Sequence, residues 1–501
     1  QKSPPNFSSN LQFGGFAPWN PDVRVNLWNT PFAAGPIQFQ THGQADGGGE
    51  DWMQQKNAPK LSFWDCARSG FWDGADVYIY RIEDGVMKLL RQSKVAKSSI
   101  GKDPQTLQPT EEKIWFTEKG PAVRNGDFYV LRMQRDKMPE QFRPELIAPE
   151  TAPKLNGYCT LTGKGDWSYD SANPAPEGGS RASLKIDVEE ASPEKPTGPW
   201  HWFVAHNDKE SKVRFKPGKS YKAQVWLKQQ GMGDPRVQIQ FGTVMTKIVD
   251  VTGEWQKFEF DLPVDDPEKP YSNTQNESTR MWIAALSPGT LWIDNFVIYQ
   301  TDTAPFSVMP EEGELLKDFK PHVLRLWGGL DAPSLDYWLS KGFAQPIRGN
   351  YGKTEAPVYA SLGEALEVCS KTGADPWIIL NPWFTAEENA NLMDYLGAPA
   401  DKGYGKLRAE HGHPEPWTKT FDKIYLESAN EAWNQIMRYA LPSQPETYAA
   451  VADRQFRELK QSPFYSKDKF EMVANGWDNG MQKDGWSRRV ALASKEADRV
   501  A

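Results

Sequence analysis

The feature that most constrains this chain is a change of sequence pattern near residue 302. Before it, short alternating apolar runs are separated by Gly, Pro, Asn and Asp. After it, helical periodicities alternate with continuous apolar runs, as at 322–329, 376–381, 423–426 and 470–475. Continuous apolar strands between helices indicate a parallel sheet covered on both faces. Residues 302–501 are therefore predicted to form an α/β domain, as in a TIM barrel or a doubly wound sheet.

Two β-rich segments precede residue 302. In residues 1–150, alternation over 75–82 followed by Glu83-Asp84-Gly85 predicts a hairpin, and 127–133 predicts a further strand of a domain whose role stays open. A proline-rich linker at 144–153 leads into residues 151–301, where short strands are spaced regularly without a helical pattern. That spacing predicts a β-sandwich of the jelly-roll type.

Composition narrows the functional class. The chain has 501 residues and a net charge of -8. No apolar stretch reaches the ~20 residues that a membrane span needs, so we expect no membrane span. An acidic chain without a basic stripe is not expected to bind nucleic acid. The 21 tryptophans have two readings: rings that stack on the C–H faces of sugars, or ordinary core filling.

In a parallel α/β barrel, the chemistry lies where the strands end. The predicted strand ends carry amides, tryptophans, an arginine and a carboxylate, which together suit a polyhydroxylated ligand. These residues are Arg325, Trp327, Asn381, Trp383, Asn430, Glu431, Trp433 and Trp477. We therefore predict that the chain binds a carbohydrate polymer or oligosaccharide.

The pair Asn430-Glu431 follows an apolar strand directly. A carboxylic acid at a strand end can protonate a glycosidic oxygen if its pKa is raised, and a neighbouring amide can hold the sugar 2-hydroxyl. In the other reading, the asparagine simply caps the helix that follows. Both readings stay open at this point.

Four stretches, in order, carry a family resemblance. They are 315–329, which ends in Leu324-Arg325-Leu326-Trp327-Gly328-Gly329; 365–376; 404–416, which reads Tyr-Gly-Lys-Leu-Arg-Ala-Glu-His-Gly-His-Pro-Glu-Pro; and 424–431, which ends in Glu427-Ser428-Ala429-Asn430-Glu431. Together they resemble the catalytic barrel of glycoside hydrolase family 51, the α-L-arabinofuranosidases of clan A.

The resemblance implies a (β/α)8 barrel and a retaining double displacement. Glu431 matches the general acid/base, Asn430 its neighbouring sugar-binding amide, and Arg325 the arginine that supports the nucleophile. His413 lies in the 404–416 stretch and is a candidate substrate contact. His411 and His413, two residues apart without a third ligand, make a poor zinc site.

The chain departs from the family at three places. The family's Pro-Gly-Gly-Asn reads Trp327-Gly328-Gly329-Leu330, and its Gly-Asn-Glu reads Ala429-Asn430-Glu431. The family's nucleophile lies on the seventh strand, whereas about five βα units are predicted here, ending in a helix over 486–501. Asp478 is the in-chain candidate for a second carboxylate, or it simply ends a loop.

Residues 157–300 resemble carbohydrate-binding modules of families 4 and 22. The run 291–299 is similar to their terminal strand, in which Asp294 either joins a structural Ca²⁺ site or bonds backbone in a turn. No cofactor is otherwise expected. Trp200 and Trp202 alternate on one strand, so both rings face one side as a sugar platform or as core.

Two functions follow from these patterns. The first is a secreted, periplasmic or cell-surface glycoside hydrolase. The second is a non-catalytic carbohydrate-binding or surface-assembly protein built on a degenerate or truncated barrel. An open half-barrel would expose a sheet edge and apolar faces, so a further C-terminal segment or a partner chain is expected to complete the barrel. Its first strand is expected upstream, near residues 11–16.

Overall fold

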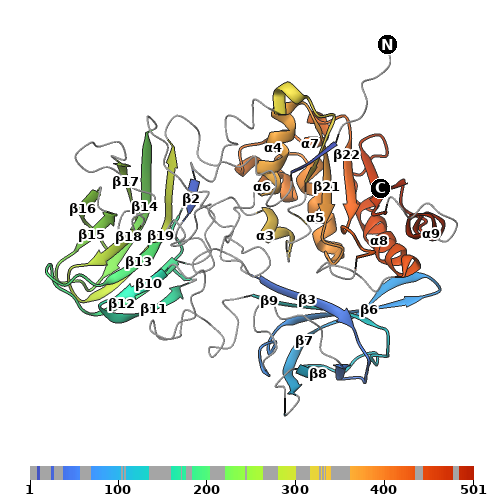
Figure 1. The fold of residues 1–501 in the computed structure, drawn as a ribbon, viewed down its shortest axis with the longest axis horizontal. Coiled ribbons are helices and arrows are strands. Elements are labelled where there is room, and N and C mark those ends of the chain that lie inside the picture. Colours follow the sequence, from blue (N-terminus) through green and yellow to red (C-terminus); the bar gives the residue numbers. More distant parts are fainter. Residues whose placement is uncertain are drawn as a thin grey trace.

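The computed structural model describes a large part of the chain in several pieces. These are residues 8–11, 24–26, 38–56, 69–102, 105, 109–134, 159–170, 172–176, 183–202, 220–242, 245–262, 280–300, 316–326, 329, 332, 334–339, 361–434, 444–477 and 485–501. Four sheets organise them, and Figure 1 shows where each lies.

A parallel sheet of six strands forms the α/β domain. Its order is β1 (Ser8–Leu11), β20 (Val323–Leu326), β21 (Asp375–Leu380), β22 (Ile424–Ser428), β23 (Phe470–Ala474) and β24 (Arg499–Val500). The helices that accompany it are α3 (Leu335–Leu339), α4 (Leu362–Thr372), α5 (Ala386–Gly397), α6 (Gly403–Glu410), α7 (Trp417–Thr420), α8 (Pro445–Lys460) and α9 (Trp486–Ala493).

Local chemistry explains why these elements form where they do. All five residues of β22 are buried, as expected for a strand covered on both faces. Helix α4 begins with a capping box between Ser361 and Glu364 and ends at Gly373, whose φ of 72° suits glycine. Helix α5 begins with a second capping box, between Thr385 and Glu388.

The α/β domain differs from the expectation in two respects. Residues 486–501 are not one helix: α9 ends at Ala493, and Arg499–Val500 pair with Val473 and Ala474 as strand β24. The upstream strand exists as β1, somewhat earlier than predicted, and pairs with β20. The described residues supply six parallel strands of the eight in a closed barrel, so the complete (β/α)8 barrel stays a prediction.

A sheet of seven strands lies in residues 38–134. Its order is β3 (Gln38–Gln44), β9 (Phe128–Gln134), β6 (Asp76–Glu83), β7 (Val86–Lys102), β8 (Pro109–Phe116), β5 (Trp52–Lys56) and β4 (Gly47–Gly48). The predicted hairpin is present as β6–β7. Its turn residues Asp84 and Gly85 have φ values of 51° and 74°, as a tight two-residue hairpin turn requires.

Two antiparallel sheets form a β-sandwich in residues 159–300. One has the order β10 (Cys159–Thr162), β13 (Gly198–Trp202), β18 (Arg280–Ala285), β15 (Arg236–Phe241) and β16 (Met245–Asp250). The other has β11 (Lys164–Asp170), β12 (Ser183–Glu190), β19 (Gly289–Gln300), β14 (Tyr221–Gln230) and β17 (Gln256–Leu262), and β2 (Arg24–Asn26) pairs with β19. Apolar side chains from both sheets make one core.

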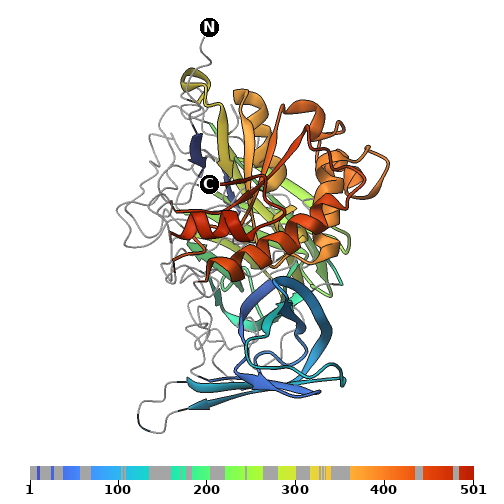
Figure 2. The same cartoon turned by 90° about the vertical axis from the view of Figure 1, so that its right-hand side faces the viewer.

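The expected domain of residues 1–150 is divided among three units. Strand β1 belongs to the α/β sheet, β2 belongs to the sandwich, and only residues 38–134 form the seven-stranded sheet. That sheet packs against the α/β domain, because Tyr80, Met87, Phe128 and Val130 share a core with its helices and strands. Figures 1 and 2 both show the sheet lying directly beneath helices α5 and α8.

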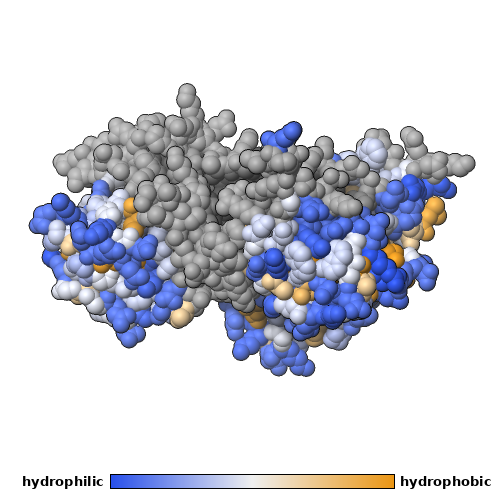
Figure 3. Space-filling model, turned by 90° about the horizontal axis from the view of Figure 1, so that it is seen from below, coloured by the Kyte–Doolittle hydropathy of each residue, from blue (hydrophilic) through white to orange (hydrophobic). Residues whose placement is uncertain are grey.

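The described surface is largely polar. Figure 3 shows mostly hydrophilic side chains on one face, with apolar ones scattered among them. The large exposed hydrophobic residues in the described ranges are Leu89, Ile248, Phe319, Trp477 and Leu492. No helix in those ranges combines the length and apolar character needed to cross a bilayer.

Candidate functional site

The ends of β20, β22 and β23 bring polar side chains together at one edge of the sheet. Because neighbouring strands are parallel, their carboxyl ends lie side by side. Arg325 on β20, Glu427 on β22 and Asn475 just after β23 meet there, and Trp377 of β21 lies between them. The Tyr448 hydroxyl of α8 ties two of these ends by donating to the Ser428 carbonyl and accepting from the Asn475 amide.

Glu427 is the centre of this cluster. Its side chain is fully buried, and its Oε2 accepts hydrogen bonds from Arg325 Nε at 2.8 Å and Trp377 Nε1 at 2.7 Å. Arg325 Nη2 lies 2.6 Å from the same oxygen, while Asn475 Nδ2 donates to Oε1 at 3.0 Å. Burial raises the pKa of the Glu427 carboxyl, and the Arg325 guanidinium and these donors oppose the rise.

Asn430 connects to the cluster through Arg325. Arg325 Nη2 donates to Asn430 Oδ1 at 2.8 Å. This bond uses the oxygen of the Asn430 amide and not its nitrogen, Nδ2. That Nδ2 is buried and has no hydrogen-bond partner in the structure. An unpaired buried amide costs about 1–3 kcal/mol, and this cost is relieved when a water molecule or a ligand supplies an acceptor.

The backbone around Asn430 is strained. Ala429 has a φ of 62° and Glu431 a φ of 45°, and both values lie in the left-handed region that disfavours residues with a Cβ atom. Such strain gathers at functional sites, where the surrounding contacts maintain it. The helix-capping reading is not what the described residues show, because helix α8 begins after Gln444 and Asn430 bonds Arg325 instead.

Glu431 and two tryptophans lie next to this strained turn. Glu431 is partly buried, and Asn434 Nδ2 donates to its Oε2 at 3.1 Å. The rings of Trp433 and Trp477 stack with centroids 5.0 Å apart and an interplanar angle of 17°. Trp477 is 41% exposed, and Trp433 is fixed by a bond from its Nε1 to the Gly476 carbonyl. The site therefore combines a carboxylate, an unpaired amide and an aromatic surface.

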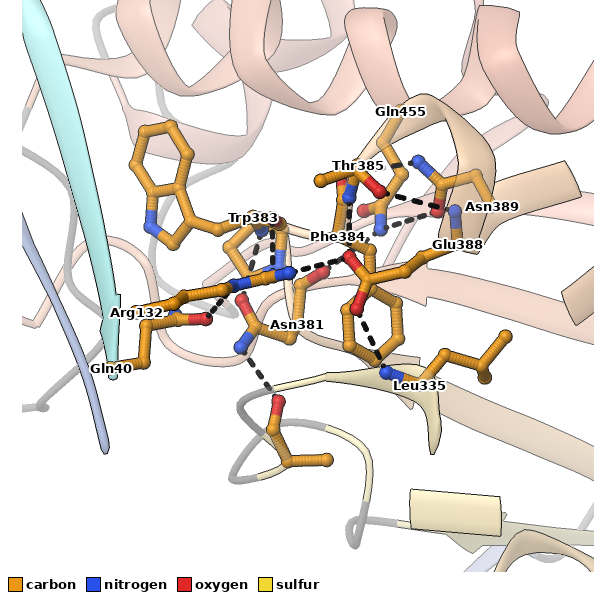
Figure 4. A network of polar contacts seen from close by, with 12 residues as sticks. Gln40, Arg132, Leu335, Asn381, Trp383, Phe384, Thr385, Glu388, Asn389 and Gln455 are labelled. Atoms are coloured by element: carbon orange, nitrogen blue, oxygen red, sulfur yellow. Dashed lines mark hydrogen bonds and ion pairs between the residues drawn. The ribbon is translucent and has the colours of Figure 1, made fainter. Parts of the chain in front are cut away.

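Asn381 and Trp383, two predicted substrate contacts, lie in a different environment. Asn381 is fully buried; its Nδ2 donates to the Ala332 carbonyl and its Oδ1 accepts from the Trp383 amide. The Trp383 ring packs against His42, Tyr80 and Phe128 of the seven-stranded sheet. Figure 4 shows both residues inside the polar network that joins the two units. Asn381 and Trp383 therefore pack at the contact between the two units.

The remaining predicted residues are scattered. His413 stacks on Trp417 with a centroid distance of 3.5 Å and pairs with Glu367 of α4, so its contacts lie in the helical layer. Asp294 is buried, and its Oδ2 accepts the Ala175 amide at 2.9 Å. No group of three His, Cys, Asp or Glu in the described ranges is arranged to hold a metal ion, and the calcium site stays a prediction.

Three predicted features lie outside what the structure describes. Trp327 and Asp478 belong to residues that it does not cover, and the side chains of Trp200 and Trp202 are likewise not described. Of the predicted strand-end residues, the structure brings together Arg325, Asn430, Glu431, Trp433 and Trp477.

Sequence reasoning gave no role to Glu427, Trp377 or Asn475. Glu427 carried a signal, since a lone carboxylate within the apolar run 424–428 requires a buried partner. The identity of that partner depends on β20 and β22 lying on either side of β21, which no local pattern encodes.

No protein-family model matches the chain, and no curated protein matches it in sequence. Parts of it are similar in structure to solved proteins. An arabinose-bound family 51 α-L-arabinofuranosidase aligns with 68% of this chain and 56% of its own length, at 14% identity and a TM-score of 0.46. The α-L-arabinofuranosidase of Thermotoga maritima, in its arabinose complex, aligns with 39% of this chain and 38% of its own, at 22% identity and a TM-score of 0.31.

A binding domain is also among the structural neighbours. The CBM22-1 xylan-binding domain of Paenibacillus barcinonensis Xyn10C aligns with 29% of this chain and 87% of its own, at 15% identity and a TM-score of 0.19. The chain spans about half the length of the first arabinofuranosidase and less of the second. All three likenesses are partial and of low identity.

Proposed function

We propose that the chain is a glycoside hydrolase acting on a polysaccharide or oligosaccharide by retaining double displacement, with Glu431 as the general acid/base. The observation that carries the proposal is the strained turn at the end of β22. It holds Asn430, whose Nδ2 is buried and unpaired, directly before Glu431 in the chain. A sugar hydroxyl would satisfy that amide, and a glycosidic oxygen would take the proton of that acid.

The surroundings support a carbohydrate ligand. The stacked rings of Trp433 and Trp477 offer an aromatic surface on which a sugar C–H face can lie, and Trp477 is exposed enough to receive it. The sequence resemblance makes an α-L-arabinofuranoside the first substrate to test. A polysaccharide substrate places the protein in the secreted, periplasmic or cell-surface compartment. The second carboxylate of a retaining mechanism lies about 5–5.5 Å from the first, and Asp478 is our candidate.

The proposal is tested by replacing Glu431 with glutamine. The whole chain and its Glu431→Gln variant are assayed for hydrolysis of an aryl α-L-arabinofuranoside and, separately, for binding to soluble xylan. Because general acid–base catalysis contributes about 100- to 10,000-fold, we expect turnover to fall by about 100-fold or more while binding is retained. Glu415→Gln is the matched control, since Glu415 is exposed and bonds Lys419.

The same assay separates the alternative function. A wild-type chain that binds xylan but hydrolyses nothing would favour a carbohydrate-binding protein without turnover. Equal turnover by wild type and Glu431→Gln would refute the acid/base assignment.

A further inference from the structure

Glu427 has a role that the proposed mechanism does not use. It is a fully buried carboxylate on β22, and it faces four N–H donors from three other strands or strand ends. An ionised carboxylate accepts hydrogen bonds and donates none, so this ring of donors suits the charged form. A buried charge persists only when it is paired and hydrogen-bonded, and the fixed donors therefore hold it in one geometry.

Arg325 transmits that geometry to Asn430. The guanidinium is planar, and its Nε and Nη2 are both engaged by Glu427 Oε2 at 2.8 and 2.6 Å. Nη2 has a second hydrogen, which it donates to Asn430 Oδ1 at 2.8 Å. Because the guanidinium plane is set by Glu427, the direction of this second bond is set as well. The oxygen of Asn430 is thereby turned toward Arg325, and Nδ2 becomes the unpaired end.

A second branch from Glu427 holds the other side of the turn. Asn475 Nδ2 donates to Glu427 Oε1 at 3.0 Å, and Asn475 Oδ1 accepts the Ala432 amide at 3.1 Å. Ala432 directly follows Glu431. Both flanks of the pair Asn430–Glu431 are therefore fixed through one carboxylate, which helps maintain the left-handed backbone of Ala429 and Glu431.

We infer that Glu427 is a positioning residue: through Arg325 it orients the Asn430 amide toward the substrate, and through Asn475 it holds the turn that presents Glu431. The inference rests on the proposed function. Glu427 touches no substrate in this arrangement; it acts only through the residues that do.

The test is a double-mutant cycle on hydrolysis of the aryl arabinofuranoside. Glu427→Gln keeps the shape of the side chain but places an amide among N–H donors, so the network should rearrange. Since a misplacement of about 1 Å can cost roughly 100-fold in rate, we expect kcat to fall by about that factor with KM changed little. In an Asn430→Ala background the same change should lower kcat less, because the Arg325 branch then has no amide to orient and only the Asn475 branch remains.

Glu388→Gln is the matched control. Glu388 also pairs with a buried arginine, Arg132, at 2.7 Å, but it lies at the contact with the seven-stranded sheet. Glu388→Gln should lower the melting temperature without changing kcat. If Glu427→Gln does not fold, Glu427→Asp keeps the charge and retracts it by one methylene, and a smaller fall in kcat is expected.

Each outcome bears on one of the two claims. Unchanged kcat in Glu427→Gln would overturn the positioning role, and equal losses in the wild-type and Asn430→Ala backgrounds would overturn its branch through Arg325. Both results would leave the proposed function intact. A wild-type chain without hydrolysis would instead overturn the proposed function, and the inference with it.

Discussion

Ala429 and Glu431 show how much the residue scale matters at the candidate site. Each holds a positive φ that glycine adopts without strain, and each costs on the order of 1 kcal/mol or more. The family pattern has glycine at the position of Ala429, and glycine adopts a positive φ without this cost. The backbone strain at Ala429 is therefore greater than the resemblance implies. Asn430 lies between the two strained residues with its Nδ2 buried and unpaired, and neighbouring contacts maintain the turn.

Sequence alone predicts part of this site. Asn430, Glu431, Arg325 and Trp433 were expected at strand ends, because apolar runs locate the strands and polar residues follow them. Strain at Ala429 was not predictable, since a φ value depends on what surrounds the residue. Asn381 and Trp383 show the same limit: their strand end was predicted, but another unit packs against it and buries both side chains.

Glu112 gives a prediction at the residue scale. It is a buried carboxyl on β8, and burial raises its pKa from 4.5 to about 7. Below pH 4.5 the carboxyl is protonated in the folded and unfolded chains alike. Between pH 4.5 and 7 only the folded chain keeps the proton, so folded-state stability falls as pH rises, by on the order of 3 kcal/mol in total.

Glu112→Gln removes that titration. Its melting temperature should exceed that of wild type at pH 8, and the difference should shrink as the pH is lowered toward 4.5. The control is Glu111→Gln, the exposed neighbour on the same strand. A melting-temperature difference for Glu112→Gln that does not depend on pH would contradict the prediction.

At the scale of elements, local signals predicted well and non-local ones did not. The hairpin predicted from residues 75–85 is present as β6–β7, because alternating residues and the turn residues Asp84 and Gly85 mark it in the sequence itself. Strand β24 was missed. It has two residues, and only its pairing with Val473 and Ala474 makes it a strand. A segment of two residues is too short to carry a helical or an alternating sequence pattern.

The end of helix α4 gives a prediction at this scale. Gly373 has a φ of 72°, and a Cβ atom added there would meet nothing within 4 Å, so only the backbone opposes alanine. Gly373→Ala should destabilise the α/β domain by about 1–2 kcal/mol. Gly233→Ala is matched to it, because its Cβ would also meet open space and its φ lies outside the left-handed region.

Urea denaturation measures the two glycine variants. Gly233→Ala should be neutral or stabilising by up to about 1 kcal/mol, since alanine restricts the unfolded chain. Equal free-energy changes for the two variants would show that the left-handed cap of α4 contributes nothing specific.

At the scale of the whole molecule, the contact between the seven-stranded sheet and the α/β domain stands out. Arg132 of β9 donates to Glu388 Oε2 at 2.7 Å and to the Trp383 carbonyl at 2.9 Å, and Gln40 accepts from its Nε (Figure 4). The surrounding apolar side chains belong to both units. Two units that share a core and a buried ion pair are expected to unfold together.

Arg132→Ala tests that coupling. It leaves the Glu388 carboxylate without its cation and should cost about 3–5 kcal/mol, as for other broken buried pairs. Scanning calorimetry should show the shared transition of these two units at lower temperature or split in two. Arg236→Ala is the control, because its pair with Asp234 is exposed on the sandwich and should contribute less than about 1 kcal/mol. Arg132→Ala unfolding at the wild-type temperature would contradict the coupling.

The pairing of Ser8 with Val323 has a consequence for how the chain is made. A nascent chain leaves the ribosome from its N-terminus, so β1 emerges long before β20 exists to receive it. All strands of the seven-stranded sheet and of the sandwich are synthesised in the interval between these two paired strands. Strand β1 can pair with β20 only after these intervening residues have been synthesised, and a contact between residues so far apart in the sequence forms slowly. The strand ends that carry the candidate site can therefore assemble only after β20 and the strands that follow it have been synthesised, long after β1.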